Sequence, residues 1–165
     1  MLRFLLILCA FSSAAAGFAA AQAQVRVEPA HLEGPRPLGK QTQAAAIRDY
    51  LQSWQSFKSA FAQNRAALLD ADFVGDAHGK LAAAIQEQTA LGIRTRYQDR
   101  AHDIRIVFYS PEGLSIELTD TVEYGMQVLD HERPVAEQEE HARYIVVLTP
   151  SEVRWRVRVF QADPE

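Results

Sequence analysis

The sequence predicts an α+β domain in which three N-terminal helices pack on the concave face of a curved antiparallel sheet of four or more strands. In residues 42–91 apolar side chains recur with helical spacing, whereas after residue 103 they alternate with polar ones. The longest alternation is Gly113 to Asp130, where the even-numbered positions from Leu114 to Val128 are apolar except for Asp120. Such a strand buries one face and leaves the other in water.

The N-terminus has the pattern of a signal peptide, to which we assign residues 1–23. Arg3 precedes a short apolar run, and Ala21-Gln22-Ala23 fits the small-x-small rule, so we expect cleavage after Ala23 and a periplasmic or secreted protein. An uncleaved membrane anchor is the alternative, although the apolar run is shorter than the roughly 20 residues of a membrane span. Cleavage would also remove Cys9, the single cysteine.

Residues 24–41 are interrupted by prolines and glycines, which predicts a linker or extended arm, with a short edge strand at residues 25–27. The folded domain is expected over residues 42–162. A long amphipathic helix is expected at residues 43–63, with an aromatic stripe interrupted only by Lys58.

Two shorter helices are predicted next, at residues 65–70 and 76–91. Three acids and one histidine lie close together around the start of the last helix: Asp70, Asp72, Asp76 and His78. Helix capping and solvation explain acids at these positions better than a metal site does. We therefore expect no metal.

The remaining strands follow from alternation and turn residues. Residues 104–109 and 153–159 alternate, residues 144–148 form a continuous apolar run, and residues 110–113 have the composition of a turn. Residues 130–140 are rich in glutamate and contain Pro134, which predicts an acidic loop.

The order of these parts resembles the nuclear-transport-factor-2-like superfamily, which includes proteins similar to ketosteroid isomerase and the polyketide cyclases. The resemblance covers roughly residues 42–162. It rests on the helix with Trp54 and Phe57, on the stretch from Ala66 to Val74, and on a last hairpin whose final strand contains Trp155. It implies a cystatin-like cone with an apolar pocket at its wide end, and it leaves the activity open because members of this fold are enzymes or binding proteins.

Asp120 is the strongest candidate for chemistry, because a carboxylate on an apolar strand face is costly unless it is paired. If it faces the pocket, it could act as a general base with Tyr124 or His102 as hydrogen-bond donor. The favoured interpretation is that Asp120 sits at a β-bulge and points elsewhere. The expected pocket lining is Tyr50, Trp54, Phe57, Tyr97, Asp120, Tyr124 and Met126.

Five arginines (105, 143, 154, 156 and 158) could form a basic stripe on the outer sheet face, although cross-strand pairing with acids is the simpler interpretation. This face is also where the resemblance implies a homodimer. The net charge of −4 is not that of a nucleic-acid-binding domain. We also expect no cofactor, and membrane contact only through an uncleaved signal segment.

These observations predict a secreted or periplasmic, non-catalytic binding domain with a pocket for a small apolar ligand. Two alternatives remain open: a cofactor-free isomerase, cyclase or dehydratase that uses Asp120 as general base, and an assembly scaffold of the cell envelope.

Overall fold

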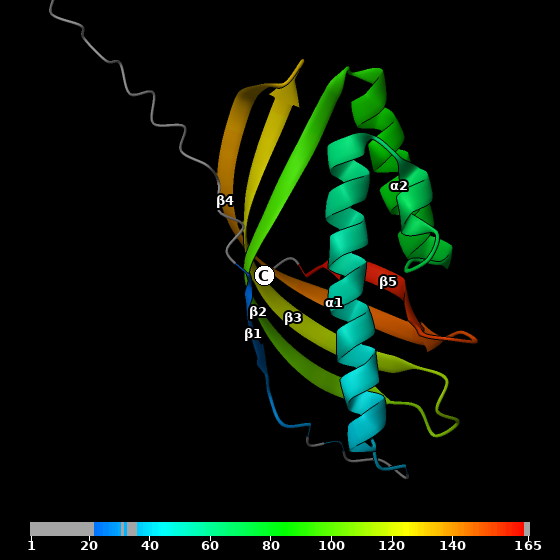
Figure 1. Cartoon of the computed structure of the whole chain (residues 1–165). Coiled ribbons are helices and arrows are strands. Elements are labelled where there is room, and N and C mark those ends of the chain that lie inside the picture. The colour runs from blue at the N-terminus through cyan, green and yellow to red at the C-terminus, as the bar shows by residue number, and fades with distance from the viewer. Residues whose placement is uncertain (1–21, 31, 33–35, 164–165) are drawn as a thin grey trace, which may run out of the picture.

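The structure is a computed structural model that describes residues 22–30, 32 and 36–163. Most of the expected signal segment lies outside these residues. The α-helices lie on one side of a strongly curved sheet (Figure 1). The elements in chain order are β1 (Gln24–Val27), α1 (Lys40–Gln63), the 3₁₀ turn η1 (Ala66–Leu69), α2 (Gly75–Ala90), β2 (Ile93–Tyr109), β3 (Ile116–Asp130), β4 (Arg133–Pro150) and β5 (Trp155–Ala162).

The sheet has five strands in the order β1-β2-β3-β4-β5. Strand β1 runs parallel to β2 and pairs with residues 101–104 only, whereas the other neighbours are antiparallel. The α+β class is therefore right, but the sheet is mixed. The prediction of three helices is also corrected, because the expected second helix is the single 3₁₀ turn η1.

Helix α1 begins three residues earlier than expected, after Gly39, and ends at Asn64 in a left-handed conformation. The Asn64 side-chain amide then donates a hydrogen bond of 2.9 Å to the carbonyl of Ile93, at the start of β2. This bond ties the end of the helix to the first residue of the long strand.

The acidic segment 130–140 is a strand, so its prediction as a loop is wrong. A tight turn at His131 and Glu132, both with positive φ, leads directly into β4. Beyond the part of β4 that pairs with β5, the strand forms an exposed edge. Charged residues and a proline are what such an edge needs in order to resist pairing with other chains, so they do not exclude a strand.

Extra residues in the strands bend the sheet. Relative to β3, strand β2 carries one extra residue at Arg100 and another at Val107. Each such β-bulge increases the local twist and reverses which side chains face the core. The bulge at Arg100 also lies at the point where pairing with β1 ends.

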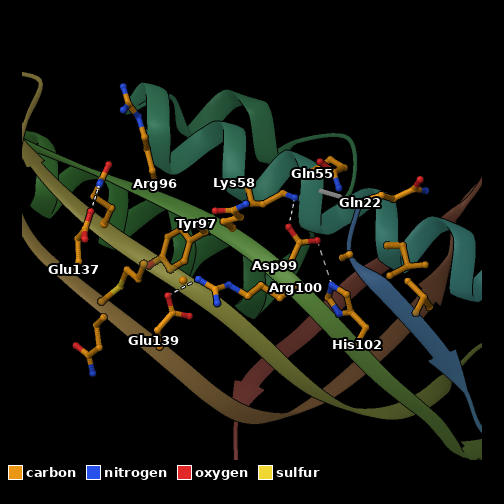
Figure 2. A pocket seen from close by; sticks show the side chains of 18 residues that line it. Gln22, Gln55, Lys58, Arg96, Tyr97, Asp99, Arg100, His102, Glu137 and Glu139 are labelled. Carbon is orange, nitrogen blue, oxygen red and sulfur yellow. Dashed lines mark hydrogen bonds and ion pairs between the residues drawn. The ribbon is translucent and has the colours of Figure 1, made fainter. Parts of the chain in front are cut away.

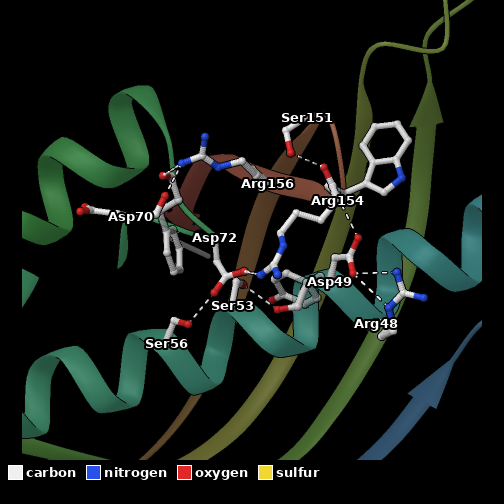
Figure 3. A network of polar contacts seen from close by, with 12 residues as sticks. Arg48, Asp49, Ser53, Ser56, Asp70, Asp72, Ser151, Arg154 and Arg156 are labelled. Atoms are coloured by element: carbon white, nitrogen blue, oxygen red, sulfur yellow. Dashed lines mark hydrogen bonds and ion pairs between the residues drawn. The ribbon is translucent and has the colours of Figure 1, made fainter. Parts of the chain in front are cut away.

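Buried polar contacts fix β5 against the helices (Figure 3). Asp72, with 2% of its surface exposed, accepts hydrogen bonds from Ser56 on α1 at 2.5 Å and from Arg154 at 2.7 Å. Asp49 on α1 accepts the backbone N–H of Trp155 at 2.9 Å. Arg156 donates to the carbonyl of Phe73.

These contacts argue against an arginine stripe, the less favoured interpretation of the sequence. Arg154 and Arg156 turn toward the helices and the η1 region instead of joining a basic outer face. Arg105 pairs with Glu28, and Arg143 lies 3.8 Å from Asp163. These four arginines therefore serve local pairing.

Replacing Asp72 by alanine should lower the free energy of unfolding by about 2 kcal/mol, because Ser56 and Arg154 would lose a buried acceptor. The loss of unfolding free energy is moderate because Arg154 is partly exposed and keeps access to water. Urea unfolding would measure the loss. Glu87→Ala, on the exposed face of α2, is the control and should change stability by less than about 0.5 kcal/mol. Equal stability of both variants would contradict the assignment.

Candidate functional site

A cleft of about 940 Å³ runs between α1 and the part of β2 that β1 leaves unpaired (Figure 2). One side is formed by Leu51, Gln55 and Lys58, which follow helical spacing on α1. The other side is formed by residues 96–100 and His102 of β2. Parts of β3 and β4 complete the walls, together with Gln22, Ala23 and Val25.

The bulge at Arg100 creates the floor of the cleft. In a regular strand, residues 99 and 102 point to opposite faces because side chains alternate. The extra residue reverses the alternation, so that Asp99 and His102 both face the helices, with 7% and 1% of their surfaces exposed. Asp99 therefore lies beside Lys58 and His102.

A continuous row of buried polar side chains starts at this floor. Lys58 donates to Asp99 Oδ1, and His102 Nε2 lies 3.3 Å from Asp99 Oδ2. On its other side, His102 Nδ1 lies 2.7 Å from Asp120 Oδ2, which also accepts a bond of 2.7 Å from the Tyr50 hydroxyl. The row alternates in charge, so that cation and anion are paired at each step.

The carboxylates set the protonation state of the histidine. Burial alone would lower the pKa of His102, but the hydrogen bonds and charges of Asp120 and Asp99 outweigh it and raise the pKa to about 9. Burial alone would raise the pKa of Asp99, but hydrogen bonds from His102 and Lys58 hold that pKa far below its usual range. At neutral pH the histidine is therefore an imidazolium between two carboxylates.

Tyr50 is the second side chain that bonds to Asp120 Oδ2. Burial raises the pKa of its hydroxyl well above the usual value, and the nearby charge of Asp120 adds to the effect. Tyr50 thus remains a neutral donor to Asp120 while it accepts a hydrogen bond of 2.9 Å from Trp54 Nε1. This end of the row lies in the core and not at the cleft.

The favoured interpretation of Asp120 as a bulge residue is wrong. Asp120 pairs regularly with Ile104 and Tyr144, and it points into the core with none of its surface exposed. The bulge lies on the neighbouring strand at Arg100 instead. Among the described residues its second oxygen, Oδ1, has no hydrogen-bond partner.

The structure separates the residues expected to line one apolar pocket. Of that set, Tyr97 and Met126 line the cleft. Tyr50, Trp54, Phe57 and Asp120 are buried in the core, and Tyr124 packs against it. Rings from both layers fill the concave side of the sheet, since the centroid of Trp54 lies 5.2–6.2 Å from those of Phe57, His102, Tyr124, Tyr144 and Phe160.

Of the three catalytic candidates, the structure brings only Asp120 and His102 together. Tyr124 bonds instead to the hydroxyl of Tyr144 at 3.2 Å. Sequence reasoning missed Lys58 and Asp99 as site residues. Lys58 had a signal, as the one polar side chain within the aromatic stripe, whereas Asp99 had none because its orientation depends on the bulge.

The acids considered for a metal site have other partners. Asp70 pairs with His78 at 2.8 Å, Asp76 with Lys80 at 2.8 Å, and Asp72 with Arg154. Within the described ranges, no three histidine, cysteine or acidic side chains converge as metal ligands.

Comparisons of the sequence find no relative, because no family model and no curated protein matches. Comparisons of the structure do. The intermembrane space region of the chloroplast protein ARC6 matches with a TM-score of 0.62 and 13% identity, over 79% of this chain and 100% of that one. A protein from Novosphingobium aromaticivorans described as a scytalone dehydratase matches with a TM-score of 0.54 and 12% identity, over 76% and 89% of the two chains.

The chain has the nuclear-transport-factor-2-like fold. A periplasmic fragment of TraM is also similar, with a TM-score of 0.52 and 13% identity, over 72% of this chain and 98% of that one. The resemblance seen in the sequence is thereby confirmed. Since all these identities are low, the nuclear-transport-factor-2-like fold by itself assigns no activity.

Neither helix in the described part of this fold combines the length and the apolar composition that a membrane span requires.

Raising the pH should destabilise the protein through His102. Its folded pKa of about 9 lies above the ordinary value of 6.5, so its stabilising effect is complete below pH 6.5 and is lost as the pH rises through 9. Such a shift corresponds to roughly 3 kcal/mol of unfolding free energy. Urea unfolding at several pH values would measure the loss.

The control for this pH dependence is His102→Gln, which keeps a polar side chain without a titrating group. This variant should be less stable at pH 6.5 and should lose most of the slope between pH 6.5 and 9. If the unfolding free energy of the variant depends on pH as strongly as that of the wild type, another titrating group causes the effect.

Proposed function

We propose that this chain is a non-catalytic binding domain of a periplasmic or extracellular compartment, whose ligand enters the cleft between α1 and β2. The observation that carries the proposal is that the reactive side chains are already paired with one another. Lys58, Asp99, His102 and Asp120 form a closed row with no net charge. A row of this kind positions the cleft walls but leaves no free base or acid for a substrate.

Catalysis of the isomerase, cyclase or dehydratase type has less support. A general base has to come within hydrogen-bond reach of the proton it removes. Asp120 is fully buried, and the aromatic cluster occupies the space in which a substrate would lie. His102 borders the cleft, but both of its ring nitrogens face carboxylates.

Three observations support the compartment. The sequence begins with the pattern of a signal peptide. Two of the similar structures are a periplasmic fragment and an intermembrane space region.

A binding cleft is also compatible with the third hypothesis, an envelope scaffold, since a scaffold binds through such surfaces. Binding is therefore the property to test first.

Filling the mouth of the cleft should abolish binding without unfolding the protein. Gln55 is exposed on α1 at the cleft, so Gln55→Trp would occupy this space, whereas Gln52→Trp lies one turn away on a different surface. NMR shift mapping with a library of aromatic, aliphatic and amino-acid fragments provides the measurement. Shifts should cluster at Tyr97, Met126 and Lys58 in the wild type and in Gln52→Trp, and should be lost in Gln55→Trp.

Two results would count against this function. Fragment shifts that gather elsewhere on the domain would remove the cleft as the binding site. If Gln55→Trp binds the fragments as the wild type does, the cleft is also excluded as the binding site, provided that urea unfolding gives the two variants similar stability.

A further inference from the structure

The cleft borders β3 and β4 and also reaches the edge of β2 beside α1. Residues 96, 97, 98, 99 and 100 all line it, although neighbouring residues of a strand point to opposite faces. In the described part of the chain, this stretch of β2 pairs with β3 on one side and with no strand on the other, so the cleft reaches its edge. The strand β1 occupies the next part of the same edge, along residues 101–104.

Among the described residues, no strand pairs with the outer edge of β2 before Ala101. The carbonyl of Ile93 accepts its hydrogen bond from Asn64 and therefore points away from β3. Backbone groups of alternate residues point to the same side of a strand, so those of Thr95, Tyr97 and Asp99 also point away from β3. Tyr97 is half-buried and lines the cleft, so its N–H and C=O are the pair that a strand in the cleft would meet.

The side chains of the edge favour an acidic partner. Arg94, Arg96 and Arg100 lie on the outer face of β2, at the unpaired edge. Arg94 and Arg96 share the single carboxylate of Glu132, while Arg100 pairs with Glu139 two strands away. A strand added at this edge would lie directly opposite the arginines, where an acid is the favourable cross-strand neighbour.

The inner side of the same edge favours apolar residues. Leu51 and the ring of Tyr97 border the cleft there, together with Met126. A strand alternates its side chains, so one that places acids against the arginines would place its other residues against this apolar wall.

We propose that the free edge of β2 binds an extended acidic segment of a partner protein by strand addition, with alternating acidic and apolar side chains. This inference rests on the proposed binding function and names its ligand class. A second copy of this chain fits poorly as the occupant. In a two-fold dimer, β2 would pair antiparallel with β2 of the second copy. If the two-fold axis passes through Arg96, Tyr97 or Gln98, an arginine lies opposite an arginine, and this repulsion disfavours the pairing.

The test uses the mature protein and three dye-labelled, capped peptides of about six residues, the usual length of a strand. They alternate glutamate with valine, lysine with valine, and glutamate with serine. Fluorescence anisotropy at low ionic strength should show binding of the glutamate–valine peptide only, weakening as salt is added. Amide hydrogen exchange at Tyr97 should slow on binding, since that N–H would gain an acceptor.

Charge reversal makes the test specific. Arg96→Glu should weaken the glutamate–valine peptide about tenfold and should bind the lysine–valine peptide better than the wild type does. Arg96 is more than half exposed, so the substitution leaves the core intact. Arg143→Glu, an exposed arginine on another strand, is the matched control and should bind like the wild type.

The possible results separate this inference from the proposed function. No peptide binding, or equal binding by Arg96→Glu and the wild type, overturns strand addition. If the fragments still map to the cleft, the binding function stands without the peptide. Peptide-induced exchange protection on the β4 edge instead of at Tyr97 overturns the assignment of the surface, whatever the fragments show.

Discussion

The buried row of charges from Lys58 to Asp120 is the constraint on which the rest of the structure depends. A carboxylate in the core is expensive unless it is paired, and Asp120 is paired with an imidazolium and a tyrosine hydroxyl. Its partners come from α1 and β2, so the row joins the long helix to two strands of the sheet. Such a network specifies how the layers fit together, because a shift of either layer would leave a buried charge without a partner.

The same row explains why the concave side of the sheet is filled. Trp54 covers both the Tyr50 hydroxyl and the ring of His102, and further aromatic rings pack around it. Aromatic side chains supply large apolar surfaces with one polar atom, which suits a core that contains ions. The accessible space is thereby displaced from the middle of the cone to the strand edge beside α1. The interior apolar pocket that the resemblance implied is filled by these side chains.

Much of the fold could be predicted from the sequence. The helical stripe around Trp54 and the alternation around Asp120 are strong periodic signals, and they located α1 and β3. The site could be predicted only in part. Asp120 stood out because it broke an apolar pattern, but the pattern could not show that His102 and Asp99 face the same way. That orientation follows from the bulge at Arg100, which a periodic signal cannot place. The strand at Glu137 was missed because charges that protect an edge resemble those of a loop.

The bulge at Arg100 also affects how this protein can change during evolution. Substitutions at exposed positions leave the alternation of β2 intact, whereas loss of one residue between Asp99 and His102 would turn one of the two away from the core. The number of residues in the middle of β2 is therefore more constrained than their identity. Relatives of this chain would then be identified by the position of an extra residue inside a strand, where alignments seldom place a gap. Identity of 12–13% with the structures it resembles leaves few shared side chains by which to recognise such relatives.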